Sequence, residues 1–192
     1  MQLWPGNGGL PDLIVGRGFY KLGYVTTDRD AAVKVLGNEY GFEHFVPFEP
    51  TLPVSTDDGR TGPASLRCAF SAGRDLVIEV MEPVDGLVGI FREALAGAAG
   101  FRMAFHHVGV LVDDFDAATA TMARHGLRAA WRADLPNGMQ VSYTRLPLLA
   151  HMVELVRYGG DSGAFLARVR AQAPPEREVL LMFEKCSGSR WS

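Results

Sequence analysis

One segment of this chain occurs twice, and the repeat constrains the fold more than any other feature of the sequence. Residues 19–28 (FYKLGYVTTD) resemble residues 105–114 (FHHVGVLVDD), so that Lys21 corresponds to His107. The same spacing aligns residues 30–32 with residues 116–118, both Asp-Ala-Ala. Each copy therefore predicts a strand, then an aspartate that caps a helix, then the helix itself.

Three strand-like runs follow each predicted helix, which gives two tandem βαβββ units. The runs are 42–48, 65–70 and 75–81 in the first copy and 127–132, 140–146 and 151–157 in the second. The expected helix caps are Asp28 or Asp30 and Asp114 or Asp116, with Gly41 and Gly126 at the helix ends. The segment Glu49–Pro63 carries three prolines and an Asp-Asp-Gly turn, so it is expected to be a long polar loop beside a site.

The rest of the chain is expected to extend this pair of units. The predicted parts are an N-terminal extension (1–18), the first unit (19–83), a linker helix (84–103), the second unit (104–158), and a C-terminal helix and tail (159–192). The apolar run 179–183 in the tail fits either a strand or a helical turn. The predicted fold class is α+β.

Composition excludes several kinds of partner. The 192 residues are 47% hydrophobic and 21% charged with a formal net charge of −3, and no basic stripe is present to bind nucleic acid. The sequence contains no run of about 18 apolar residues, so no membrane-spanning helix is predicted. Without a secretory signal at the N-terminus, we expect a cytoplasmic location. Cys68 and Cys186 are too few for a disulfide framework or a zinc ribbon. Composition names no function, and a small molecule is expected as the partner because of the candidate site residues.

Strand alternation selects the side chains that share a face. Lys21 and Gly23 are expected on one face of the first strand, with Tyr20 on the other. By the same rule His106 is expected to point away from His107, toward packing or the surface.

Two glutamates stand inside otherwise apolar strands, Glu79 in LVIEVM and Glu154 in MVELV. Burying a carboxylate is costly without a cation or a hydrogen-bond partner. If the two units pack into one cup, Lys21, Glu79, His107 and Glu154 converge there. One histidine and two glutamates suit a divalent first-row metal such as Zn, Ni, Co, Mn or Fe. The competing interpretations are a structural ion pair for the glutamates, a hydrogen-bonded core histidine and an exposed strand lysine.

Two further residues are candidates for substrate binding. Tyr143 and Arg145 share one face of the strand expected next to the last one. They are positioned to bind or steer an anionic substrate, although a solvated arginine fits the sequence equally well.

The repeated βαβββ unit, the phrase His106-His107-Val108-Gly109-Val110 before two aspartates, and Val153-Glu154-Leu155 resemble the vicinal oxygen chelate superfamily. That superfamily includes glyoxalase I, methylmalonyl-CoA epimerase and the extradiol dioxygenases. The resemblance covers about residues 19–158 and implies a curved, open-barrel mixed sheet around a metal, often in a homodimer. It carries His107, Glu154 and Glu79 over as metal ligands.

Lys21 departs from that pattern, because it stands where the family usually has a histidine or glutamine ligand and an ammonium cannot ligate a metal. Lys21 either replaces the metal as a fixed charge between Glu79 and Glu154, or swings aside, or binds a substrate carboxylate. The resemblance implies a lyase, isomerase or epimerase that moves a proton next to a carbonyl through an enolate-like intermediate, with Glu79 as general base and Lys21 or a metal stabilising the oxyanion. The alternatives are a metal-free ligand-binding protein and, more weakly, an extradiol dioxygenase.

Overall fold

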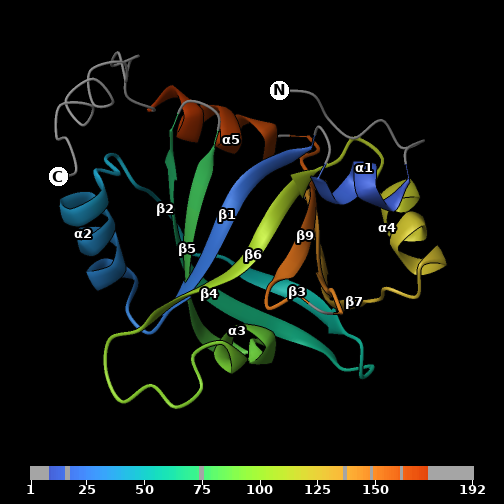
Figure 1. The fold of residues 1–192 in the computed structure, drawn as a ribbon, viewed down its shortest axis with the longest axis horizontal. Helices are drawn as coiled ribbons and strands as arrows, with labels where there is room; N and C mark the ends of the chain where they lie inside the picture. The colour runs from blue at the N-terminus through green and yellow to red at the C-terminus, as the bar shows by residue number, and fades with distance from the viewer. Residues whose placement is uncertain are drawn as a thin grey trace, which may run out of the picture.

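Nine strands form one mixed sheet that curls around a central space (Figure 1). The computed structural model describes residues 9–15, 18–73, 76–135, 138–147, 149–160 and 162–172. The strands are β1 (Phe19–Thr26), β2 (Val46–Phe48), β3 (Thr51–Thr56), β4 (Thr61–Ala72), β5 (Val77–Gly86), β6 (Met103–Leu111), β7 (Ala129–Asp134), β8 (Gln140–Arg145) and β9 (Met152–Arg157). The helices are α1 (Leu10–Val15), α2 (Arg29–Tyr40), α3 (Gly89–Glu93), α4 (Phe115–Arg124) and α5 (Ser162–Ala171).

The strand order closes the sheet into a barrel. The order is β2-β4-β3-β7-β8-β9-β6-β1-β5, and an additional pairing between β4 and β5 joins the two ends, with β2 left at an edge of β4. Within each unit the first and last strands are parallel neighbours, β1 with β5 and β6 with β9. The units meet through the antiparallel pairs β1–β6 and β3–β7. The predicted α+β class with a curved mixed sheet is confirmed, and the curvature goes as far as closure. The first unit has four strands after its helix, β2 to β5, instead of the predicted three.

The helix caps follow from the first aspartate of each predicted pair. The Asp28 side chain accepts a hydrogen bond from the Ala31 amide at 3.0 Å, and Asp114 accepts one from Ala117 at 2.9 Å. Helix α2 ends at Gly41, whose φ of 72° is the left-handed conformation that glycine adopts without strain. Helix α4 ends slightly earlier than predicted, at Arg124.

The prediction of a long polar loop over Glu49–Pro63 is wrong. Most of this segment is strand β3 and the start of β4, joined by a short turn. Leu52 and Val54 alternate with exposed residues and point into the core. The prolines concealed this pattern, yet Pro53 and Pro63 face each other in the register of β3 and β4. Strands β2 and β3 both pair with β4: β2 pairs with its later residues and β3 with its earlier residues.

Two β-bulges overturn the alternation predicted for Tyr20 and His106. The β1–β6 register skips one residue on each strand, Tyr20 on β1 and His106 on β6. An extra residue in one strand locally breaks the alternation of side chains. Tyr20 therefore packs in the interior cluster together with Phe70, and the His106 imidazole lies against that of His107.

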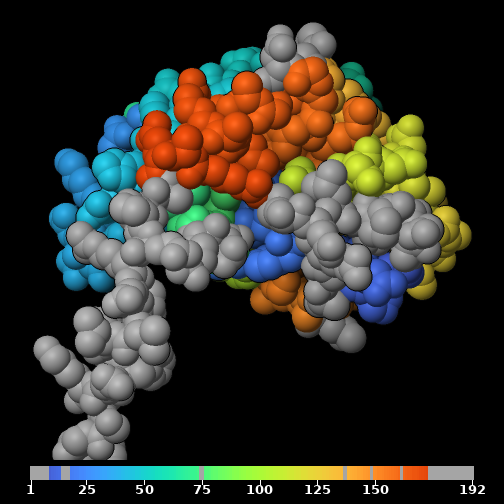
Figure 2. All heavy atoms as spheres, turned by 90° about the horizontal axis from the view of Figure 1, so that it is seen from above, coloured from blue at the N-terminus to red at the C-terminus, as the bar shows by residue number. Residues whose placement is uncertain are grey.

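Three hydrophobic clusters divide the packing between the inside and the outside of the barrel. The largest fills the interior, while α4 and α2 cover separate outer faces with β9 and β5 respectively. Helix α5 lies across one end of the barrel (Figures 1 and 2). Its residues Leu166 and Val169 are buried. None of the helices in the described residues has the length and apolar character needed to cross a membrane. The tail run 179–183 lies outside the described residues.

Candidate functional site

At the centre of the barrel, β1 and β6 pair twice in such a way that a large polar residue on one strand lies opposite a glycine on the other. Lys21 is the register partner of Gly109, and His107 is the partner of Gly23. A Cβ atom at Gly23 would overlap the His107 imidazole, and one at Gly109 would lie 2.9 Å from the Lys21 side chain. The two glycines therefore provide the space in which Lys21 and His107 fold over the neighbouring strand.

The outer neighbours of these strands add the two glutamates. On β5, Glu79 is the register partner of Gly23, and on β9, Glu154 is the partner of Gly109. The two units thus deliver one glutamate each to the same point. This register explains how four residues far apart in sequence become one cluster.

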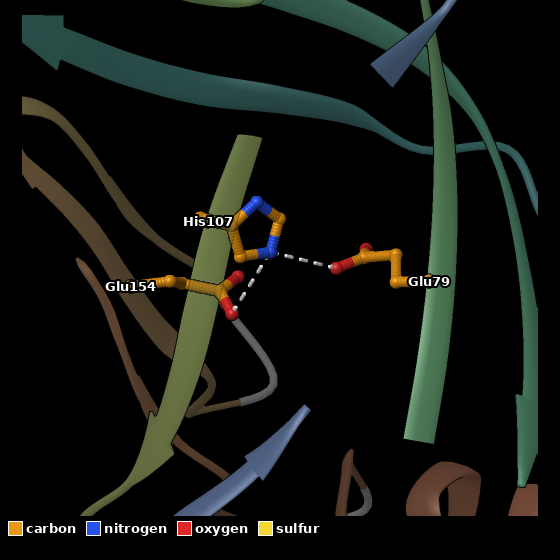
Figure 3. Close-up of side chains that lie close together, drawn as sticks. All are labelled: Glu79, His107 and Glu154. Atoms are coloured by element: carbon orange, nitrogen blue, oxygen red, sulfur yellow. Dashed lines mark ion pairs between the residues drawn. The ribbon is translucent and has the colours of Figure 1, made fainter. Parts of the chain in front are cut away.

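Lys21, Glu79, His107 and Glu154 form a buried charge cluster in which no side chain is more than 5% exposed. The Lys21 Nζ atom pairs with Glu79 Oε2 and, at 2.7 Å, with Glu154 Oε2. His107 Nε2 lies 3.3 Å from Glu79 Oε2 and 3.6 Å from Glu154 Oε2 (Figure 3). Tyr143 donates a hydrogen bond of 2.8 Å from Oη to Glu154 Oε1.

The ion pairs of the cluster shift the pKa values of Lys21 and Glu79 so that both side chains stay charged. Burial opposes a charge on Lys21, but Glu154 and Glu79 outweigh it and raise the pKa of Lys21 far above its ordinary value. Burial also acts to raise the pKa of Glu79, yet Lys21 and His107 lower it to about 2. Lys21 is therefore an ammonium rather than a free amine. This single ammonium is shared by the side chains of two glutamates.

The neighbouring His106 orients His107. His106 Nε2 lies 3.2 Å from the carbonyl of Ile90, and the two Nδ1 atoms are 3.1 Å apart. Burial lowers the pKa of His106 to about 3, so its ring is neutral. Because the carbonyl can only accept, Nε2 of His106 carries the proton and its Nδ1 accepts from Nδ1 of His107. Nε2 of His107 is then the ring atom that faces Glu79 and Glu154.

The donor set can hold a metal ion. Glu79, His107 and Glu154 each offer one ligand atom, and these three atoms lie within 4.8 Å of one another. Apart from the ion pairs, the two Oε2 atoms and Nε2 have no hydrogen-bond partner within the described parts of the chain. Acceptor atoms left in this way suit a cation. Lys21 competes with a metal for the same site, because its ammonium touches both carboxylate oxygens that would ligate the ion.

The charged cluster forms the polar end of a cavity of about 170 Å³. Lys21, Glu79 and Glu154 line that end. The remaining wall is mainly apolar and aromatic, with contributions from Phe48, Phe70, Trp131, Tyr143, Tyr158 and Phe165. Phe165 belongs to α5, so this helix contributes to the cavity wall.

The other candidates from the sequence divide between the cavity and the surface. Tyr143 is buried beside Glu154, whereas Arg145 is half-exposed, pairs with Glu93 at 2.6 Å and does not line the cavity. His151 stacks on Phe105 outside the cluster. Sequence reasoning missed the cavity residues Tyr158 and Phe165, as well as the orienting contact of His106. No local signal marks an aromatic residue as cavity-lining, and only the bulge reveals His106.

We expect Gly23→Ala to lower the free energy of unfolding by about 1–3 kcal/mol, because the added methyl group overpacks the rigid imidazole of His107. Urea denaturation measures the change. Gly89→Ala is the matched control, since a Cβ there meets nothing within 4 Å. Adding His107→Ala to Gly23→Ala removes the clash, so the double variant should lose less stability than the sum of the single changes. An additive result would contradict this account of the glycine.

Comparisons with known proteins identify a family whose model matches this chain and solved structures with a similar fold. A family model described as the Glyoxalase/Bleomycin resistance protein/Dioxygenase superfamily matches residues 20–143. Among solved structures, a variant methylmalonyl-CoA epimerase of Streptomyces coelicolor in complex with 2-nitronate-propionyl-CoA is 18% identical, with 73% of this chain and 93% of that chain covered and a TM-score of 0.51. A methylmalonyl-CoA epimerase from Mycobacterium tuberculosis is 17% identical, with 83% and 98% covered and a TM-score of 0.47. At such identities the likeness is one of fold. A search of curated proteins finds no match.

Proposed function

The chain belongs to the Glyoxalase/Bleomycin resistance protein/Dioxygenase superfamily, and from that premise we propose that it is an enzyme that moves a proton next to a carbonyl group. The observation that carries the proposal is the Lys21 ammonium held between Glu79 and Glu154 at the end of an otherwise apolar cavity. An enolate intermediate needs a cation at its oxygen and a base at its carbon, and this cluster offers both.

Lys21 is the proposed oxyanion stabiliser. An ammonium has three N–H donors, of which two point to the glutamates, so the third can bind a substrate oxygen in the cavity. The raised pKa of Lys21 keeps its proton on the nitrogen and disfavours Schiff-base chemistry, which requires a free amine. The positive charge is fixed in place before the reaction, so it costs no reorganisation when the enolate forms.

Glu79 is the proposed general base. Its Oε1 has no hydrogen bond to any described residue, whereas both oxygens of Glu154 are engaged, one by Lys21 and one by Tyr143. In the reaction the substrate C–H bond breaks, the proton binds Glu79, and the carbonyl becomes an enolate at Lys21. As negative charge develops on the enolate oxygen beside Lys21, the lysine stabilises the Glu79 carboxylate less, so the pKa of Glu79 rises toward its ordinary value, which favours the proton transfer.

Return of the proton completes the turnover. Delivery to the opposite face of the same carbon gives an epimer, and delivery to a neighbouring carbon gives an isomer. Glu154 and Tyr143 position Lys21 through their shared hydrogen bond. If a divalent ion binds, Glu79, His107 and Glu154 are the residues that would hold it, and it would supply Lewis-acid polarisation of the carbonyl.

Solvent-deuterium exchange tests the proposal. The protein, purified without chelator and analysed for bound metals, is incubated in D2O with small ketones, and NMR follows loss of the signal of the protons next to the carbonyl. We expect exchange above the buffer rate both before and after EDTA treatment, because Lys21 supplies the charge.

The other outcomes discriminate between the alternatives. Exchange that EDTA abolishes and Zn²⁺ restores would mean that a metal, not Lys21, stabilises the enolate. An absence of exchange across the panel would refute the proposed activity. Ligand binding without exchange would identify the chain as a metal-free binding protein of the same fold.

A further inference from the structure

We infer that the cavity takes a neutral carbonyl compound that carries a single six-membered ring, attached within one or two carbons of the carbonyl. The inference rests on the proposed function for the role of Lys21 and adds the chemical class of the substrate. Three features of the described residues carry it: the size of the cavity, the spacing between Lys21 and the aromatic wall, and the two glutamates that flank Lys21.

The size of the cavity suits a ligand with one ring. The cavity of about 170 Å³ slightly exceeds the roughly 150 Å³ apolar cavity that accommodates benzene. It is smaller than the roughly 300–1,000 Å³ pockets that enclose drug-sized ligands. A benzene-sized ring with a short carbonyl side chain fits such a space.

The aromatic wall lies close to the charged end. Phe48, Phe70 and Phe165 form a contiguous group, with ring centroids of Phe70 and Phe165 at 5.0 Å and those of Phe48 and Phe165 at 5.1 Å. The Lys21 Nζ atom is only 5.6 Å from the centroid of Phe70. A ligand whose carbonyl oxygen binds Nζ therefore places atoms one or two bonds beyond the carbonyl against this group. Aromatic rings pack there by offset or edge-to-face contact.

Charge selects a neutral ligand over an anion. Lys21 offers one positive charge, but Glu79 and Glu154 already surround it, and a substrate carboxylate at Nζ would lie beside two like charges. Within a buried site these repulsions are stronger than in water. Among the described residues that line the cavity, Lys21 is the sole cationic side chain, so no second cation compensates. A ketone or aldehyde oxygen accepts from Lys21 without this cost.

Saturation-transfer NMR measures the preference with three named probes. Phenylacetone is the neutral ring compound, phenylacetate is an anion of similar size, and butanone is a ketone without the ring. We expect phenylacetone to bind at least about tenfold more tightly than either of the others, since butanone loses ring contacts and phenylacetate adds charge repulsion. Equal or tighter binding of phenylacetate or butanone would overturn the inference.

Variants locate the ligand in the cavity. Leu66→Trp fills the space, and Phe165→Ala removes part of the ring contact; both should weaken phenylacetone binding. The exposed Phe101 does not line the cavity, so Phe101→Ala is a matched control that should bind as the unmodified protein does. Unchanged binding in both cavity variants, with circular dichroism showing that they are folded, would place the ligand elsewhere and overturn the inference.

Glu154→Gln tests the charge argument directly. The substitution removes one of the two carboxylates beside Lys21, while the amide oxygen can still accept from Tyr143. We expect the affinity for phenylacetate relative to that for phenylacetone to rise about tenfold. An unchanged ratio of the two affinities would contradict selection by charge.

The substrate class and the proposed function fail separately in these experiments. Binding of phenylacetone without deuterium exchange would retain the ligand class and refute the activity. Exchange of butanone without binding of phenylacetone would retain the activity and refute the ligand class.

Discussion

Glu79→Gln should lower the rate of deuterium exchange at the carbon next to the carbonyl by about 10²–10⁴-fold, the usual contribution of a positioned general base. The amide cannot take the proton, whereas Lys21 keeps its partner in Glu154. The remaining lysine–glutamate pair is charge-balanced, so we expect the fold to survive. The exchange rate and the melting temperature are measured on the same preparation.

Glu82→Gln is the matched control for this experiment. Glu82 lies on the same strand but pairs with Arg67 near the surface, so its loss should leave exchange unchanged and cost no more than about 1 kcal/mol of stability. Phenylacetone should still bind to Glu79→Gln, because the cavity and Lys21 remain. An unchanged exchange rate in Glu79→Gln would remove Glu79 from the mechanism and leave Glu154 as the base to test.

The sequence was sufficient to predict the two units and the four residues that converge, for a physical reason. The repeated K-x-G and H-x-G patterns place Lys21 and His107 at corresponding positions, and a lone glutamate within an apolar strand demands a partner. The structure pairs each of these large side chains with the glycine of the other strand. The glycines at corresponding positions, Gly23 and Gly109, could therefore have predicted that each large side chain packs closely against the neighbouring strand.

Features that depend on the pairing register of two strands could not be predicted from the side-chain alternation along a single strand. The bulges at Tyr20 and His106 exist only in the pairing of β1 with β6, so alternation along either strand assigns both side chains to the wrong side. Strand β3 was missed because prolines usually interrupt strands. The cavity wall gathers single aromatic residues from several strands and α5, and nothing local distinguishes them from ordinary core.

Lys21→Met should reverse the pH dependence of stability. In the unmodified protein the pKa of Glu79 is lowered from 4.5 to about 2, so its contribution to stability is present above pH 4.5 and is lost as the pH falls toward 2. Without the ammonium, two carboxylates remain buried side by side, and burial and mutual repulsion raise their pKa values above 4.5. Their protonated forms then favour folding below pH 4.5, and this contribution is lost as the pH rises.

We therefore expect Lys21→Met to lose about 3–5 kcal/mol of unfolding free energy at pH 7, as when one partner of a buried ion pair is removed, and to recover part of it at pH 5. Urea denaturation at both pH values measures this reversal, with exposed Lys34→Met as control. Zn²⁺ should stabilise Lys21→Met more than the unmodified protein, because the ion can replace the ammonium between Glu79, His107 and Glu154. A Lys21→Met variant that is equally stable at pH 5 and pH 7 would show that the lysine does not balance these carboxylates.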